Sequence, residues 1–64
     1  MKIAEITVDL MTGGRVVEYM KVKDHKHFGK RMNKMVRKGS LDFGAVVVDM
    51  AAVEQIGVKW HAIN

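Results

Sequence analysis

The sequence contains no cysteine, and this absence removes two of the usual supports of a very small domain. Disulfide bonds are excluded, and so is a metal site with thiolate ligands. A chain of 64 residues buries only about 60% of the surface that its unfolded form exposes, so its core is marginal. We therefore expect a homodimer to supply additional buried surface.

Nucleophilic side chains are also scarce, with one serine, Ser40, and two threonines, Thr7 and Thr12. Ser40 follows a predicted helix in a polar connection, where a local turn hydrogen bond explains it better than a catalytic role. A sheet of this size also leaves little room for the pocket of about 300 Å³ that small-molecule sites need. We expect no catalytic residue, no cofactor and no enzymatic activity.

Long apolar runs are absent as well, and none approaches the roughly 18 residues of a membrane-spanning helix. The first residues alternate charged and apolar side chains, which is unlike a signal peptide. With 48% hydrophobic residues, the chain has the composition of a folded protein and not of a disordered basic tail. The sequence predicts one small domain over residues 1–64, located in the cytoplasm and without a membrane partner.

Positive charge is abundant but concentrated in one stretch. Eight of the eleven lysines and arginines lie between residues 21 and 38: Lys21, Lys23, Lys26, Lys30, Arg31, Lys34, Arg37 and Lys38. Only one of the seven acidic residues, Asp24, falls in the same interval. This stretch therefore carries a charge of +7 and the rest of the chain −3, which together give the net +4.

The residues from Asp24 to Gly39 have the pattern of one amphipathic helix. Asp24 suits an N-cap, and Gly39 suits the left-handed position that follows a helix. The apolar residues recur at i, i+4, i+7 and i+8, one helical stripe: Phe28, Met32, Met35 and Val36. His25 extends the stripe by one turn. Gly29 lies inside the helix at a cost of about 1 kcal/mol relative to alanine, and we expect it to mark a close approach to a strand.

A strand is predicted over Lys2–Leu10, where Ala4, Ile6, Val8 and Leu10 alternate with more polar side chains. Gly13-Gly14 then predicts a hairpin turn into a second strand, Arg15–Lys23.

Two registers are open for this hairpin. A two-residue loop pairs Leu10 with Val17 and sets Asp9 against Glu18. A three-residue loop pairs Leu10 with Val16 and turns Glu18 toward the core. We favour the first register, because a surface repulsion costs less than a buried carboxylate.

After the helix, Ser40 to Asp42 is predicted as a connection and Phe43–Met50 as a third strand. A helical turn over Ala51–Gln55 leads to a fourth strand, Ile56–Ile63, whose Trp60 faces the core. The third strand is expected to point Val46, Val48 and Met50 inward. The order strand–strand–helix–strand–strand predicts an α+β fold, with a small, mainly antiparallel four-stranded sheet and one helix packed on one face.

One helix covers only one face of such a sheet. Val17, Tyr19, Ile3 or Ile63 is expected to supply an apolar patch on the open face. That patch, or an unpaired edge strand, is where we place a dimer contact or a protein partner.

The segregated charge predicts a function in nucleic-acid binding. Lysines and arginines on one side of a helix neutralise phosphates and release counterions. The predicted contacts are the eight basic residues named above, and Tyr19 is available to stack on a base. Apart from Asn33, no side chain in the stretch suits base reading. The sequence thus favours a small regulatory or accessory protein.

Two other interpretations remain. The basic face also suits docking on an acidic protein, as an interaction module or as an inhibitor of a larger enzyme, through an edge strand or the open sheet face. It equally suits a solvated helix surface that keeps a small protein in solution.

A metal site is not expected. His25 and His27 are two positions apart, so their rings diverge on a helix, and His61 alone is available as a third nitrogen. The glycines of Thr12-Gly13-Gly14-Arg15 lie between two strand-like runs, so turn geometry explains them better than a phosphate-binding loop.

Overall fold

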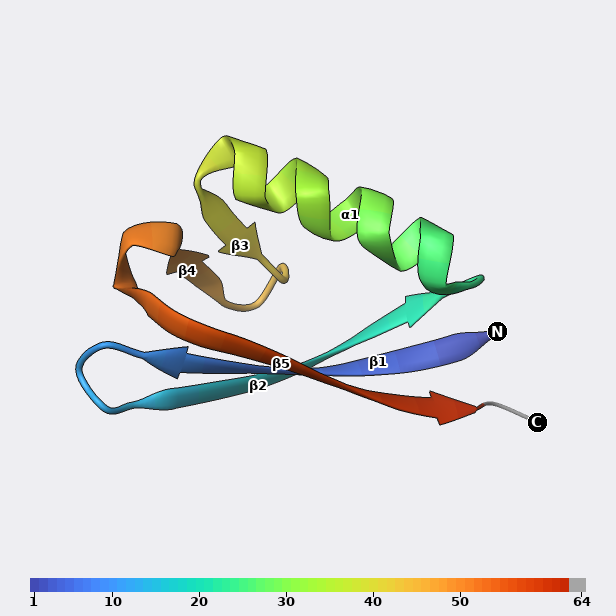
Figure 1. The fold of residues 1–64 in the computed structure, drawn as a ribbon, viewed down its shortest axis with the longest axis horizontal. Coiled ribbons are helices and arrows are strands. Elements are labelled where there is room, and N and C mark those ends of the chain that lie inside the picture. Colours follow the sequence, from blue (N-terminus) through green and yellow to red (C-terminus); the bar gives the residue numbers. More distant parts are fainter. Residues whose placement is uncertain (63–64) are drawn as a thin grey trace.

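The structure, a computed structural model, describes residues 1–62 (Figure 1). Its elements in chain order are β1 (Lys2–Leu10), β2 (Arg15–Val22), α1 (His25–Lys38), β3 (Ser40–Asp42), β4 (Val47–Asp49), the 3₁₀ turn η1 (Met50–Ala52) and β5 (Val53–Ala62). Ile63, predicted as the end of the last strand and as part of the open-face patch, lies outside the described residues. Within residues 1–62, no helix has the length and apolar character required to cross a membrane.

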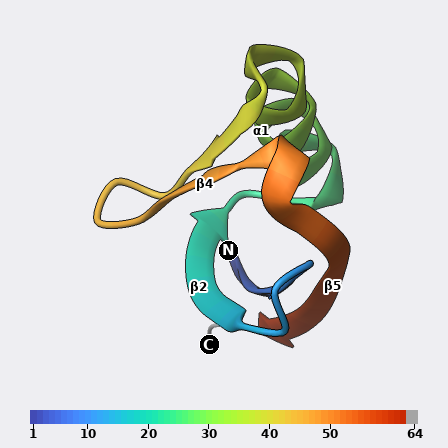
Figure 2. The same cartoon turned by 90° about the vertical axis from the view of Figure 1, so that its left-hand side faces the viewer.

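The strands form two small antiparallel sheets, and the predicted α+β class is confirmed. The larger sheet has the order β2-β1-β5, and β3 and β4 form a two-stranded sheet between it and α1 (Figure 1). Viewed from the end, the larger sheet curls, and the turn between β3 and β4 projects from the molecule (Figure 2). The structure thus has five strands in two sheets where the sequence predicted four in one.

The additional strand comes from a turn that breaks the predicted strand Phe43–Met50. The N–H of Gly44 donates to Oδ1 of Asp42 at 2.9 Å, and Gly44 has φ +90°, which favours glycine. The N–H of Phe43 donates to the Val46 carbonyl at 2.9 Å and closes the turn. The prediction of one continuous strand was wrong, and the predicted connection Ser40–Asp42 is the first strand of a hairpin.

The β1–β2 hairpin has neither of the two predicted registers. Leu10 and Gly14 close a three-residue turn, in which the Leu10 N–H donates to the Gly14 carbonyl at 2.8 Å and Gly13 has φ +95°. Asp9 consequently lies opposite Arg15, and their side chains form an ion pair at 2.7 Å. An attractive cross-strand pair thus takes the place of the predicted Asp9–Glu18 repulsion.

In the observed register Glu18 lies opposite Ile6, on the face of the sheet that carries the core. The side chain is only half-buried there. The carboxylate therefore keeps contact with water, and the desolvation cost that argued against this orientation is not incurred.

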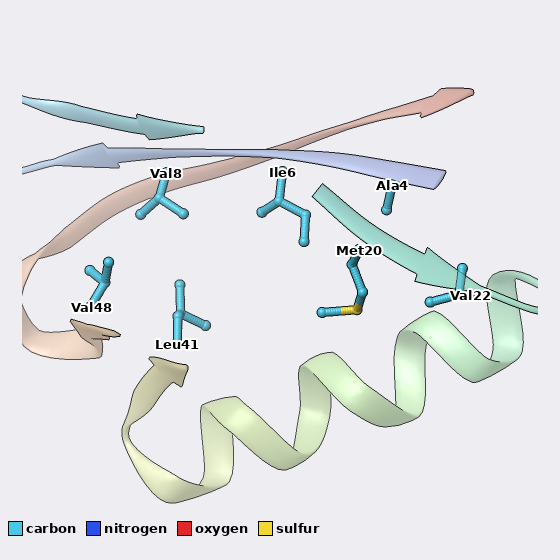
Figure 3. Close-up of a cluster of buried hydrophobic side chains, with 7 residues drawn as sticks. All are labelled: Ala4, Ile6, Val8, Met20, Val22, Leu41 and Val48. Carbon is cyan, nitrogen blue, oxygen red and sulfur yellow. The ribbon is translucent and has the colours of Figure 1, made fainter. Parts of the chain in front are cut away.

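The core is small and centred on β1. Seven residues are buried: Ala4, Ile6, Val8, Met20, Val22, Leu41 and Val48. Figure 3 shows Val8 and Ile6 of β1 pointing toward Val48 and Leu41 on the β3–β4 hairpin, with Ala4 near Met20 and Val22 of β2. The predicted inward faces of β1 and of residues 46–50 are confirmed, because Val46 and Met50 also pack against this cluster.

The helix covers the same face but contributes no fully buried side chain. Phe28, Met32 and Met35 are partly buried and pack against the core. Near the start of the helix, the Trp60 ring of β5 packs against His25, with centroids 4.2 Å apart, and edge-on against Phe28, with centroids 4.9 Å apart. Trp60 therefore faces the core, as predicted, and His25 extends the apolar stripe.

Candidate nucleic-acid interface

Local hydrogen bonds fix both ends of the helix that carries the basic residues. Oδ1 of Asp24 accepts from the His27 N–H at 2.8 Å, and Nδ1 of His27 accepts from the Lys23 N–H at 3.2 Å. This reciprocal arrangement resembles a capping box, in which two free backbone donors are satisfied. At the other end Gly39 has φ 83° and donates to the carbonyls of Met35 and Val36. The predicted N-cap and C-terminal glycine are confirmed.

The role predicted for Gly29 is wrong. A Cβ placed on Gly29 would have no atom within 4 Å, apart from its chain neighbours and the backbone of the helix itself. No strand therefore approaches it closely. The glycine lowers helix propensity without a packing reason.

The basic side chains of α1 share one outer side of the helix. At 3.6 residues per turn, they fall within an arc of roughly 140°, and the apolar stripe lies opposite. All are exposed: Lys26, Lys30, Arg31, Lys34, Arg37 and Lys38. We call these six residues the basic helix face. Its cations are close enough for an extended polyanion to contact several at once.

The other two predicted residues, Lys21 and Lys23, lie on and just beyond β2 and are also exposed. Arg31 of the basic helix face contacts β2 at Lys21, because its Nη1 donates a long hydrogen bond of 3.4 Å to the Lys21 carbonyl. The backbone at Lys21 therefore lies next to the helix, while its side chain lies on the same sheet face as Tyr19. Lys23 directly precedes the N-cap residue Asp24.

Five of the seven acidic residues have nearby partners. Each of the four aspartates has a local partner: Asp9 pairs with Arg15, Asp24 caps α1, Asp42 accepts from Gly44 and Asp49 accepts from the Ala51 N–H. Glu5 pairs with His61 at 3.0 Å on the opposite face of the larger sheet. Among residues 1–62, no carboxylate lies within ion-pair distance of any of the eight predicted basic residues. Their charge is therefore available to an external anion.

Three shallow hollows lie along this surface. One, on the outer side of α1, is lined by Lys30, Asn33, Lys34, Arg37 and Lys38. A second, of about 320 Å³, runs between α1 and β3 and is lined by Arg31, Lys34, Met35, Lys38, Ser40 and Asp42. A third, of about 380 Å³, lies between β2 and the turn after β3, and its lining includes Tyr19, Lys21, Arg31 and Asp42.

Sequence reasoning missed Asp42 and Phe43 as neighbours of the basic surface, because the β3–β4 hairpin was not predicted. The signal was the run Asp42-Phe43-Gly44, in which an aspartate precedes a glycine by two residues.

The three histidines lie in separate environments. The His25 ring packs on Trp60, with its Nε2 3.3 Å from Lys2 Nζ, and His27 completes the cap of α1. His61 pairs with Glu5 on the far face of the larger sheet. In the part of the chain that the structure describes, no three metal-ligating side chains come together.

Comparison of the chain with protein-family models, curated proteins and solved structures gave no match. The functional argument accordingly depends on the charge and geometry of the chain's own residues.

Proposed function

We propose that this chain binds nucleic acid, with the basic helix face contacting backbone phosphates and Lys21 and Lys23 extending the contact. Such a protein would act as a small regulatory or accessory factor. The observation that carries the proposal is the segregation of charge: six exposed cations share one side of α1, Lys21 and Lys23 follow on and beyond the neighbouring strand, and none of the eight has a carboxylate partner within residues 1–62. Binding of the basic helix face to a phosphate backbone would be favourable, because it releases the counterions condensed on the nucleic acid.

Binding of labelled oligonucleotides across a salt series tests the proposal. If about four to six phosphates are engaged, the logarithm of the affinity for duplex DNA falls with the logarithm of the salt concentration with a slope of roughly −4 to −5. Absence of binding at low salt would contradict the proposal.

A charge-matched pair of variants makes the test specific to the surface. Lys34→Glu reverses a cation of the basic helix face, and Lys59→Glu makes the same change on β5, opposite Glu5. We expect the first to lower the affinity roughly tenfold at low salt and to flatten the slope by about 1. The second should change the affinity by less than about twofold. Equal effects would mean that net charge alone drives binding.

A second proposal is docking on an acidic protein, for which the sheet edges are the supporting observation. Within residues 1–62, β2 and β5 each pair only with β1, so each leaves one edge of backbone groups without a strand partner. The open face carries the expected Val17 and Tyr19, which are 44% and 63% exposed, with the half-buried Ile3.

The variant Lys30→Glu/Lys34→Glu separates the two proposals. It should abolish nucleic-acid binding, whereas a partner held at a sheet edge would associate more slowly but keep a similar dissociation rate. Surface plasmon resonance with the purified partner after nuclease treatment gives both rates.

We also propose that two copies of the chain associate through the same sheet edges, because the core is small and a dimer interface would bury additional surface. Sedimentation equilibrium at micromolar concentration should give twice the monomer mass. A monomer mass at all concentrations would contradict a homodimer.

A further inference from the structure

Tyr19 differs from the other aromatic residues in its exposure. The chain has four such residues, all within the described part, and three of them pack against the core: Phe28, Phe43 and Trp60. Tyr19 is 63% exposed on β2, an edge strand of the larger sheet. An aromatic ring in this position is not required by the core, since it points to the opposite face from Met20, which is buried.

Charges of both signs surround Tyr19. Glu5 lies directly opposite it on β1 and pairs with His61 at 3.0 Å. Two cations lie on its other side. Lys21 lies two residues further along the same strand and therefore on the same face as Tyr19. Arg31 reaches the strand at that point, because its guanidinium donates to the Lys21 carbonyl at 3.4 Å. A cation from the helix and a cation from the strand thus lie beside one exposed aromatic residue.

The hollows described above join these groups into one path. The hollow of about 380 Å³ is lined by β2 at Tyr19 to Lys21, by Arg31 of α1 and by the segment Asp42 to Gly44. The hollow of about 320 Å³ shares Arg31 and continues along α1. Figure 2 shows the turn between β3 and β4 projecting on the same side of the molecule as β2. Cations and an aromatic residue therefore follow one another around the edge of the sheet.

We infer that this path, from Lys34 and Arg31 past Lys21 to Tyr19, binds single-stranded nucleic acid, with a base stacked on the Tyr19 ring. The inference rests on the proposed function and narrows its ligand. Single strands expose the faces of their bases, and aromatic side chains beside a cationic groove bind them with little sequence preference. In a duplex the base faces are covered by their neighbours, so Tyr19 would contribute little.

Asp42 sets a condition on the path, because it lines both hollows and repels phosphate. One of its carboxylate oxygens accepts from the Gly44 N–H and holds the hairpin turn. Phosphates are therefore expected on the side of the path formed by α1 and β2, away from the turn.

The decisive experiment measures the affinity of Tyr19 variants for matched single-stranded and duplex oligonucleotides. Tyr19→Ala should weaken single-strand binding roughly 5- to 150-fold, the range for loss of one stacked base, and change duplex binding by less than about twofold. Tyr19→Phe keeps the ring and should remain within about twofold of the original. Val17→Ala, two residues away on the same face and 44% exposed, is the matched control.

If Tyr19→Ala and Val17→Ala bind single strands equally well, the stacking inference is overturned, while the salt dependence continues to support the basic helix face. If neither single strands nor duplexes bind at low salt, the proposed function itself fails. Parallel measurements with DNA and RNA oligonucleotides show which sugar the path prefers.

Asp42→Asn gives a test in the opposite direction. Asparagine keeps an oxygen for the Gly44 N–H but removes the negative charge, so single-strand affinity should rise roughly two- to fivefold at low salt. If the affinity is unchanged or lower while circular dichroism shows an unaltered fold, the single-stranded nucleic acid does not pass through these hollows and the inference is wrong.

Discussion

The central strand β1 and the helix α1 contribute to the molecule in opposite ways. Three side chains of β1, Ala4, Ile6 and Val8, are 0% exposed, whereas no residue of α1 is fully buried. The helix instead carries six exposed cations on one side. Stability is therefore concentrated in the sheet and charge in the helix, and substitutions should affect the two separately.

The two outer faces of the molecule also differ in how their charges are arranged. On the far face of the larger sheet, Asp9 pairs with Arg15 and Glu5 with His61. On α1, Lys30, Lys34 and Lys38 follow one another at intervals of four residues, which places like charges next to each other. A surface that serves solubility alone has no need of such repulsion, since mixed charges serve it as well. The cost to helix stability favours a function for the basic helix face.

The largest effect is expected in β1. Ile6→Ala should lower the free energy of unfolding by about 2–5 kcal/mol, because it leaves a cavity in a core that relaxes only partly. A chain of this length has about 3–10 kcal/mol in total, so Ile6→Val, with an expected loss of about 0.5–1.5 kcal/mol, provides a folded comparison. Urea denaturation followed by circular dichroism measures both. Val36→Ala, at a residue 47% exposed on α1, should lower the free energy of unfolding much less. A loss as large as that of Ile6→Ala would contradict the conclusion that stability is concentrated in the sheet.

The next effect concerns the start of α1. Asp24→Ala should lower the free energy of unfolding by about 1 kcal/mol, because the His27 N–H loses its acceptor. Asp24→Asn keeps an acceptor oxygen and should remain within a few tenths of a kcal/mol. Thermal denaturation of the two variants decides whether the cap or the negative charge matters.

Replacement of the interior glycine should act in the opposite direction. Gly29→Ala is expected to raise the free energy of unfolding by about 1 kcal/mol, since the added methyl group meets open space and alanine favours the helix. Gly39→Ala is the contrasting variant, because φ 83° strains any residue with a Cβ, and a loss of about 1 kcal/mol is expected. Chemical denaturation that shows the same sign for both would contradict this account of the helix.

The smallest stability effect is the most informative about function. Lys34→Glu converts two like-charge contacts, with Lys30 and Lys38, into attractive ones and should raise the free energy of unfolding by roughly 0.5 kcal/mol at low salt. The same variant should lose nucleic-acid affinity. Denaturation and binding measured on one preparation show whether stability and affinity move in opposite directions. A parallel loss of both would indicate a structural role for Lys34.

The elements with local signals were predicted well from the sequence. The bounds of α1 follow from Asp24 and Gly39, whose effects act within four residues, and the inward face of β1 follows from simple alternation. The exposure of the eight basic residues could be predicted equally well, because charged side chains are rarely buried without a partner.

The elements that depend on distant partners were not predicted. The β1–β2 register brings Asp9 to Arg15 on the far face and places Glu18 on the core face. The exposure of Glu18 depends on how far the helix covers the sheet, which no local pattern shows. The β3–β4 hairpin was missed because a valine-rich run resembles one strand even when a turn precedes it. The meeting of Arg31 with β2 beside Tyr19 required the packing of α1, which no local pattern contains.

The pairing of Lys2 with Ala62 places the first and last described strands side by side in antiparallel orientation. A force applied at these two residues would open the β1–β5 ladder one backbone hydrogen bond at a time, as a zipper opens, and would not shear many bonds together. The protein should therefore offer little mechanical resistance when it is stretched from its ends, whatever its thermodynamic stability.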